Sequence, residues 1–301
     1  MIHRLDRMAV RLPEPKNPSP NDAAAIQELL GGKFGEMSTL MNYTFQSFNF
    51  RGKNRLRPFY DLICSISGEE HGHIEAVSMA INLLLTGSTQ RGRDPKPGPL
   101  QNAVDARNQY HFLASGQAAL PVDSNNNFWT GQNVFSSGNL RLDLLHNFFL
   151  ECGARANKMR VYEMVTDPCA RTMVGYLLVR GGVHVVAYAK ALEKLTGVAV
   201  GKLLPIPDLK NDRFPEAKKF MDERLHLKMF TFNPEGSYQM AGLIWNGEHP
   251  DTEEPLEFVA GMPETFPIPE LPEEPQLNAP GEDGIDPEMF AGIAKKMGIR
   301  M

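Results

Sequence analysis

Ile66-Ser67-Gly68-Glu69-Glu70-His71-Gly72-His73-Ile74-Glu75-Ala76 is the stretch around which the chain is organised. Glu70 and His73 lie three residues apart, so on an α-helix they point to the same side. Counting outward from this pair in alternating steps of four and three residues gives an otherwise apolar stripe of Phe59, Ile63, Ile66, Val77, Ala80 and Leu84. Such a stripe predicts a helix in a bundle, here from about residue 58 to 85. A carboxylate buried there must be paired with a cation or bound to a metal.

The helix before this stretch is predicted to follow the same pattern. Ser19-Pro20 predicts its start, with serine as N-cap and proline in the first turn, and the helix should run to about Phe48. Gly31-Gly32 is a weak point within it. Glu36 lies on its apolar stripe, and Tyr43 follows seven residues later on the same face.

Two more amphipathic helices are predicted after residue 137. The first carries Glu151 on its apolar stripe and Lys158 two turns later on the same face. The second is capped by Asp167-Pro168, ends at Gly197 and has His184 near the middle of its stripe. Each of the predicted long helices therefore carries a residue that can bind a metal.

The order of these segments predicts three regions in an all-α protein. Residues 1–18 read as an extended arm or short strand, and residues 19–197 as a four-helix bundle. One long crossover connection, residues 87–137, joins the two helical hairpins and includes a helix near 101–118. Residues 198–301 form an extended, mostly irregular C-terminal arm.

Within this arm, the sequence predicts a helix from Pro215 to about Leu227. Residues 247–286 are rich in proline, glutamate and aspartate, a composition that cannot build a core of its own. Asp286-Pro287 then begins a short amphipathic helix with Met289, Phe290, Ile293 and Met297. We expect this helix to dock on its own subunit or on a neighbour.

Three carboxylates and two imidazoles that converge from four helices are typical of a dinuclear metal site; they are Glu36, Glu70, His73, Glu151 and His184. Carboxylates can bridge two cations, and imidazole is a good ligand for manganese and iron. The general form of this site has a Glu-x-x-His pair on each of two helices. Here Gly181 stands three residues before His184, so one ligand is missing. We expect space or solvent in its place, where a substrate can bind.

Structural explanations exist for each of these residues alone. A single Glu-x-x-His is a weak signal, and a lone His184 on an apolar face is more often a hydrogen-bonded core histidine. Tyr43 and Tyr188 more often pack in a core than take part in catalysis. Glu69, His71 and Glu75 lie off the stripe and are expected in solvent or behind the ligands. The coincidence of four independently phased stripes favours the metal site.

Composition sets further bounds. The chain has 301 residues, 42% of them hydrophobic, and a formal net charge of -5, which argues against nucleic-acid binding. The three cysteines, Cys64, Cys152 and Cys169, form no Cys-x-x-Cys pair and fit a reducing compartment. No apolar leader or long uncharged apolar run is evident, so we expect a cytoplasmic protein that does not span a membrane.

Several segments together resemble the manganese catalases, a non-haem, ferritin-like family. The resemblance covers most of the chain and is strongest in residues 30–37 (LGGKFGEM), 69–73 (EEHGH), 137–140 (SGNL), 149–155 (FLECGAR) and 178–184 (LVRGGVH). It implies a ferritin-like four-helix bundle and a catalase that disproportionates hydrogen peroxide to water and dioxygen. Its two manganese ions would cycle between the doubly divalent and doubly trivalent states.

The resemblance also implies roles for individual residues. Glu70 would bridge the two ions, Glu36 and His73 would complete the site of one, and Glu151 and His184 that of the other. Tyr43 matches a tyrosine that hydrogen-bonds near the family's site.

The chain departs from one part of the family. Some members have an arginine immediately before the third-helix glutamate and a glutamate three before the last histidine, where this chain has Leu150 and Gly181. It resembles instead the subgroup with a lysine seven residues after that glutamate, Lys158, which could donate or stabilise a proton.

The resemblance further implies a homohexamer in which C-terminal segments wrap neighbouring subunits. Some members bind calcium near the second helix. Asp61 matches one of those carboxylates, but Ser65 stands where a second is expected, so calcium is not well supported.

Two other functions fit the residue types. A di-iron carboxylate protein, such as an oxidase or an iron-oxidising ferritin-like protein, uses the same kinds of ligand. A non-catalytic metal-binding coat or storage scaffold would use the metals only for structure.

Overall fold

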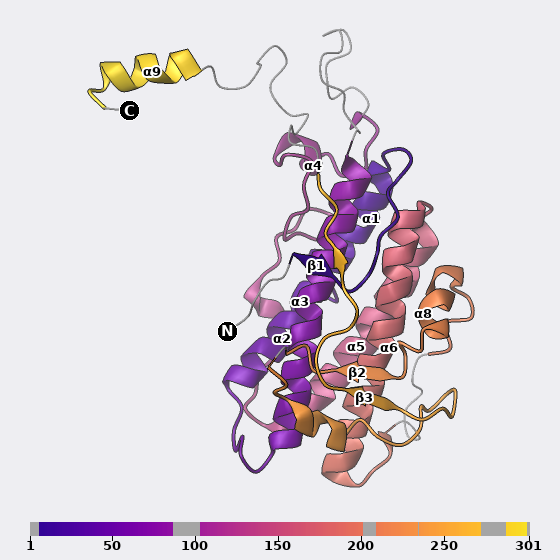
Figure 1. Ribbon diagram of the computed structural model, residues 1–301. Helices are drawn as coiled ribbons and strands as arrows, with labels where there is room; N and C mark the ends of the chain where they lie inside the picture. The colour runs from indigo at the N-terminus through magenta and orange to yellow at the C-terminus, as the bar shows by residue number, and fades with distance from the viewer. Residues whose placement is uncertain (1–5, 87–102, 201–208, 234, 272–286, 300–301) are drawn as a thin grey trace.

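The chain folds around four long helices, as a computed structural model shows for residues 6–86, 103–200, 209–233, 235–271 and 287–299 (Figure 1). These helices are α2 (Glu36–Phe48), α3 (Arg57–Leu85), α5 (Leu140–Met164) and α6 (Pro168–Thr196). α2 packs on α3 and α5 packs on α6, so two helical hairpins lie against each other. The predicted all-α, four-helix architecture is confirmed.

The prediction of a single helix from Ser19 to Phe48 is wrong, but the helix is interrupted at the predicted weak point, Gly31-Gly32. The structure divides it into α1 (Pro20–Gly31) and α2, separated by a turn at residues 32–35. The backbone of the crossover crosses at this break: a Cβ on Gly31 would lie 2.3 Å from the carbonyl oxygen of Val122. The break places Glu36 in the first turn of α2, where the helix dipole stabilises negative charge.

Helix ends elsewhere follow the sequence signals. The Asp167 side chain accepts a hydrogen bond from the Cys169 amide at the start of α6, and Gly197 ends that helix with φ of 75°. Asn139 caps α5 in the same way. Ser19 makes no side-chain cap; instead its amide donates to the Leu84 carbonyl at the end of α3. The first hairpin is thereby closed by backbone rather than by a capping hydroxyl.

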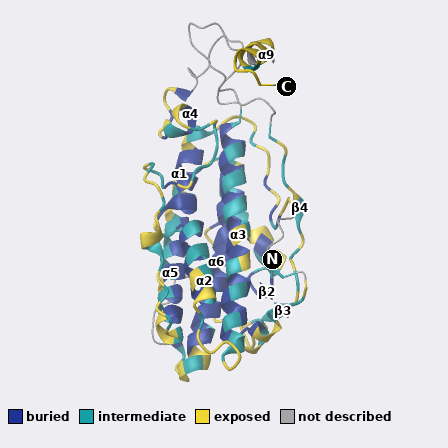
Figure 2. Cartoon of the chain, turned by 90° about the vertical axis from the view of Figure 1, so that its left-hand side faces the viewer, coloured by how far each residue is buried: buried dark blue, intermediate teal, exposed yellow. Residues whose placement is uncertain are grey.

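α6 is the central helix of the bundle. It is the one described helix long and apolar enough to cross a membrane by length and composition, but the window that meets this test is 100% buried inside the protein. Its residues are buried without a break from Thr172 to Ala189, and buried residues are coloured dark blue in Figure 2. Its apolar composition is explained by this position in the core.

The crossover is mostly irregular. Its residues 87–102 lie outside the described residues, and the helix expected near 101–118 is present only as α4 (Tyr110–Leu113). A 3-10 turn, η2, follows at Gly131–Asn133. Amide side chains hold the crossover to the bundle: Gln27 Nε2 donates to the carbonyls of Leu120 and Val122, at 2.6 and 2.9 Å.

Two small sheets and several short helical turns follow the bundle. β2 (Lys228–Phe230) pairs in parallel with β3 (Glu257–Val259), and β1 (Arg7–Met8) pairs antiparallel with β4 (Phe266–Pro267). The N-terminal arm therefore contains the expected strand. In place of the helix predicted for 215–227, the structure has η3 (Pro215–Ala217) and α8 (Lys218–Asp222).

The described part of the C-terminal region is better packed than its composition predicts. Trp245, which follows the 3-10 turn η4 (Gln239–Leu243), is 1% exposed, and its indole N–H donates to the carbonyls of Leu227 and Glu257. One buried side chain thus ties β2 and β3 together. The C-terminal α9 (Pro287–Lys296) lies away from the bundle in Figure 1, with Ile293 and Met297 exposed.

Candidate metal centre

All five predicted ligands meet in the centre of the bundle, and each is at most 1% exposed; they are Glu36 from α2, Glu70 and His73 from α3, Glu151 from α5 and His184 from α6. Glu70 lies between the two histidines. Its Oε2 is 3.3 Å from His73 Nδ1, and its Oε1 is 2.7 Å from His184 Nδ1. Glu36 Oε2 lies 3.3 Å from His73 Nδ1, and Glu151 Oε1 lies 3.4 Å from His184 Nδ1.

The donor set fits divalent cations. Ligand atoms of Glu70, His73 and His184 lie within 4.8 Å of one another. Glu70 Oε1 and His184 Nδ1 are buried and close, yet they are not aligned as a hydrogen bond, and neither has another hydrogen-bond partner in the part of the chain that the structure describes. Glu151 Oε2 is also buried without one. Buried lone pairs that converge in this way are expensive unless a cation lies between them.

The count of charged side chains at the centre also favours a bound cation. Four carboxylates are buried there, namely Glu36, Glu69, Glu70 and Glu151. Two permanently charged side chains contact them, Lys158 and Arg180. Two negative charges therefore remain for metal ions or protons to neutralise.

The pKa values of these groups respond to that imbalance. Burial alone would raise the pKa of Glu36, but the Lys158 ammonium and His73 outweigh it and hold this pKa well below its ordinary value. Burial alone would lower the pKa of both histidines, yet the facing carboxylates raise it well above the ordinary value. Among the carboxylates, the largest contribution to the raised pKa comes from Glu70 for His73 and from Glu69 for His184. Without metal, the imidazoles supply the positive charge that the carboxylates need.

Lys158 occupies the gap that Gly181 leaves. Its ammonium lies 2.8 Å from Glu36 Oε1, and the side chain is 1% exposed. A Cβ on Gly181 would lie 3.4 Å from Lys158 Nζ. The expected empty or solvent-filled space beside Gly181 is therefore wrong at this point, because the lysine head group fills it. Leu150, the other departure from the family pattern, packs in the apolar core.

Two tyrosines adjoin the Glu151 side of the centre. Tyr43 donates its hydroxyl to Glu151 Oε1 at 2.6 Å, and its ring lies 5.3 Å from that of Tyr188. Burial and the charge of Glu151 raise the pKa of Tyr43 well above its ordinary value, so the phenol keeps its proton. The Tyr188 hydroxyl is fully buried and has no hydrogen-bond partner among the described residues.

Sequence reasoning missed Thr39 and Arg180 and left Glu69 unresolved. Thr39 Oγ1 lies 2.8 Å from Glu70 Oε2 and orients that carboxylate. Glu69 is 3% exposed and pairs with Arg180 at 2.5 Å. Their spacing along the helices could have predicted these positions. Thr39 lies three residues after Glu36, and Glu69 and Arg180 each lie four residues before a predicted histidine ligand. By contrast, His71 is exposed and Glu75 half-buried.

The carboxylate of Asp61, considered for calcium, is already engaged. Its Oδ1 pairs with Arg57 Nε at 2.5 Å, and its Oδ2 accepts the Met240 amide at 3.1 Å. Ser65 donates its hydroxyl to the Asp61 backbone carbonyl. The arginine supplies the countercharge that a calcium ion would otherwise provide.

Comparison with known proteins gives a consistent result. The family model described as "Manganese containing catalase" matches residues 1–297. The manganese catalase of Lactiplantibacillus plantarum is 30% identical over 84% of this chain and 92% of its own length. That of Bacillus subtilis is 29% identical over 82% and 86%. The protein YjqC of Bacillus subtilis (strain 168) is 34% identical, over 60% of this chain and 66% of its own length.

A solved structure shares the fold. KatB, a manganese catalase from Anabaena, superposes on 87% of this chain and all of its own, with a TM-score of 0.56 and 21% sequence identity. At this identity the likeness concerns the helical architecture alone.

Thr39 provides a test of how Glu70 is held. We expect Thr39→Val, which keeps the side chain's shape but removes its hydroxyl, to weaken manganese binding roughly 10- to 100-fold, as lost partners of metal ligands do. The measurement is the manganese dissociation constant by competition with a chelator. Thr44→Val on the same helix, whose hydroxyl contacts Ser67 Oγ at 3.0 Å, is the matched control. Equal dissociation constants for the two variants would contradict this role.

Proposed function

The chain belongs to the family of manganese-containing catalases, and we propose that it acts through two manganese ions held by Glu36, Glu70, His73, Glu151 and His184. The observation that carries this assignment is the position of Glu70, with one oxygen facing each histidine. It supports Glu70 as the bridge, Glu36 and His73 as ligands of one ion, and Glu151 and His184 as ligands of the other.

Family membership gives the reaction and the cofactor. The enzyme is an oxidoreductase that disproportionates hydrogen peroxide to water and dioxygen at a dimanganese centre. The oxygen and nitrogen ligand types alone leave a di-iron protein open, and the family match decides for manganese. It also decides against a purely structural scaffold.

The chemistry needs electrons and protons to be stored between two peroxide molecules. One peroxide is oxidised to dioxygen and gives up two electrons and two protons; the next takes up both and becomes two waters. A manganese pair that alternates between the doubly divalent and doubly trivalent states would supply the electron store. The protons must be held by groups of the chain beside it.

Lys158 and Tyr43 are our candidates for proton handling. Each lies in direct contact with a different proposed ligand, Lys158 with Glu36 and Tyr43 with Glu151. Both keep their protons near neutral pH, because neighbouring carboxylates raise the pKa of each group despite the burial that would by itself lower that of the lysine. They can thus lend a proton to a departing oxygen and recover it in the other half of the cycle.

The protein should contain two manganese ions per chain and evolve oxygen from peroxide. We expect Glu70→Ala to lose both properties, because it removes the oxygens that face both histidines. Elemental analysis and an oxygen electrode, applied to one preparation, measure them; Glu163→Ala, at an exposed position of α5, is the control. Two irons per chain without oxygen evolution, or wild-type rates in Glu70→Ala, would overturn the proposal.

Lys158→Met separates proton handling from metal binding. We expect oxygen evolution to fall roughly 100-fold, in the range that one positioned acid–base group contributes, with two manganese ions per chain retained. Lys194→Met, which removes an exposed lysine of α6, should change neither. A wild-type rate across the pH range in Lys158→Met would remove this lysine from the mechanism.

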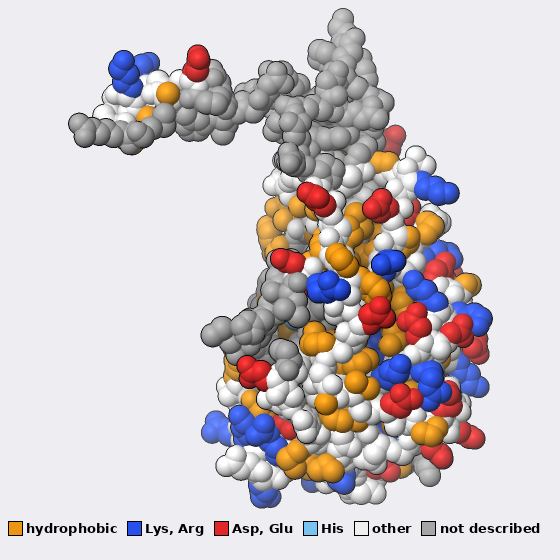
Figure 3. Space-filling model, viewed as in Figure 1, with side chains coloured by type: hydrophobic (Ala, Val, Ile, Leu, Met, Phe, Trp, Pro, Cys, Tyr) orange, Lys and Arg blue, Asp and Glu red, His pale blue; other side chains and the backbone are white. Residues whose placement is uncertain are grey.

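We propose that the protein assembles as a homohexamer. Large apolar side chains stand exposed on α2 (Phe45 and Phe48) and on α5 (Leu142 and Phe149), which supports burial between subunits. On the face in Figure 3, hydrophobic side chains gather over the middle, and positive and negative charges intersperse near α8. This mixture offers protein contacts rather than a basic track for nucleic acid.

Light scattering should therefore give about six times the chain mass of 33.6 kDa. We expect removal of residues 272–301 to reduce that mass, if this segment wraps a neighbouring subunit. A full-length protein that scatters as a single chain would contradict the proposal.

We also infer that the enzyme works in a reducing compartment such as the cytoplasm. Cys64, Cys152 and Cys169 are all free thiols. Unpaired cysteines in a chain of this size fit that environment.

A further inference from the structure

Glu69 contacts both histidines from the side opposite the proposed ligands. Its Oε2 lies 3.0 Å from His184 Nε2, and its Oε1 lies 3.6 Å from His73 Nε2. Both imidazoles thus turn Nε2 toward Glu69 and Nδ1 toward the other carboxylates. The Glu69 carboxylate within hydrogen-bond distance of His184 Nε2 favours the tautomer with the proton there, which leaves the Nδ1 lone pair of His184 free for a metal. His73 Nε2 lies near Glu69 without a hydrogen bond to it.

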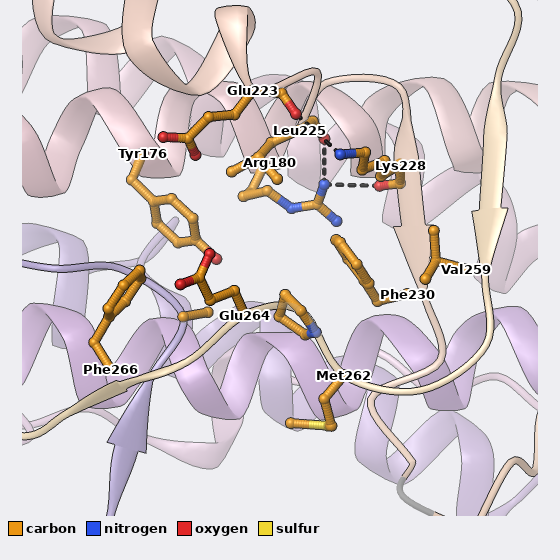
Figure 4. A pocket seen from close by; sticks show the side chains of 12 residues that line it. Tyr176, Arg180, Glu223, Leu225, Lys228, Phe230, Val259, Met262, Glu264 and Phe266 are labelled. Carbon is orange, nitrogen blue, oxygen red and sulfur yellow. Dashed lines mark hydrogen bonds between the residues drawn. The ribbon is translucent and has the colours of Figure 1, made fainter.

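Arg180 links Glu69 to the C-terminal region. It donates Nε and Nη2 to Glu69 at 2.5 and 3.0 Å. Its Nη1 donates to the backbone carbonyls of Leu225 and Lys228 at 2.5 and 2.7 Å. Figure 4 shows these last two bonds at the edge of a pocket of about 400 Å³, with the guanidinium group between α6 and the segment that leads into β2.

The segment 223–230 therefore helps to hold Arg180, and through it Glu69, in place beside the histidines. Arg180 is 1% exposed, and its guanidinium lies 5.4 Å from the centre of the Phe230 ring. A buried guanidinium needs acceptors for its N–H groups, and here the segment supplies two of them. If the segment moves away, Arg180 loses those acceptors, and Glu69 is no longer held toward the histidines.

We propose that Glu69 and Arg180 are positioning residues that couple metal binding to the docking of residues 223–230. This inference rests on the proposed function, because it takes His73 and His184 as ligands. Coupling between two sites is reciprocal, so each event must favour the other to the same extent. Manganese should protect the segment, and loosening the segment should weaken manganese binding.

The experiment uses the full-length enzyme, with manganese alone as the probe. Hydrogen–deuterium exchange of residues 223–230 is measured with and without manganese, and the manganese dissociation constant is measured by chelator competition. In the wild type we expect manganese to slow exchange in this segment. In Glu69→Gln we expect that slowing to be lost and the dissociation constant to rise roughly 10- to 100-fold.

Two further variants act from the C-terminal side. Trp245→Phe removes the indole N–H bonds to the Leu227 and Glu257 carbonyls, without touching any residue of the centre, and should raise the dissociation constant. Lys218→Gln is the control: its exposed ammonium pairs with Asp222, outside residues 223–230, and the variant should leave manganese binding unchanged. Glu69→Gln changes a buried residue of the centre itself, whereas Trp245→Phe tests the coupling from outside the centre.

The outcomes separate this inference from the proposed function. A wild type that binds two manganese ions and evolves oxygen, but shows the same exchange in residues 223–230 with and without the metal, would overturn the coupling alone. Equal dissociation constants in Trp245→Phe and Lys218→Gln would do the same. A wild type that binds no manganese would overturn the function itself.

Discussion

The structure depends on keeping four carboxylates charged inside an apolar helical bundle. Glu36, Glu69, Glu70 and Glu151 are each at most 3% exposed. An isolated buried carboxylate would cost several kcal/mol. Lys158 and Arg180 neutralise two of the four charges, and the two proposed manganese ions would more than offset the other two. The histidines hold the carboxylates apart and take up protons when no metal is bound. Metal binding and bundle packing are thus parts of one electrostatic balance.

Helix geometry makes that balance achievable with few residues. A step of three or four along a helix places the next side chain on the same face, so Thr39 reaches Glu70 from the turn after Glu36, and Arg180 lies one turn from His184. The break between α1 and α2 further stabilises the charge of Glu36, because it places this residue at a helix N-terminus. A continuous helix would have kept the same side chain but lost the favourable dipole.

The bundle and the convergence of the five proposed ligands could be predicted from the sequence, because both follow from the periodicity of residues within each helix. Three features depend on contacts between distant segments, and of these the sequence predicted only a weak point at Gly31-Gly32. The break before α2 arises where the crossover at Val122 meets Gly31. The inward position of Glu69 needs Arg180, more than a hundred residues away. The packed C-terminal region depends on Trp245 reaching two strands at once, which a proline-rich, acidic composition conceals.

Gly181 shows how an absent side chain can serve a site. Glycine inside a helix costs roughly 0.5–1 kcal/mol relative to alanine, and here it breaks a second Glu-x-x-His pair. Yet a Cβ at this position would lie 3.4 Å from Lys158 Nζ, so a longer side chain would displace the ammonium from Glu36. A glutamate would add a fifth negative charge where the chain now has a positive one. The missing ligand and the buried lysine are therefore one adaptation: the glycine makes room for the cation that keeps Glu36 ionised, and the centre retains a proton donor where it would otherwise have had another acceptor.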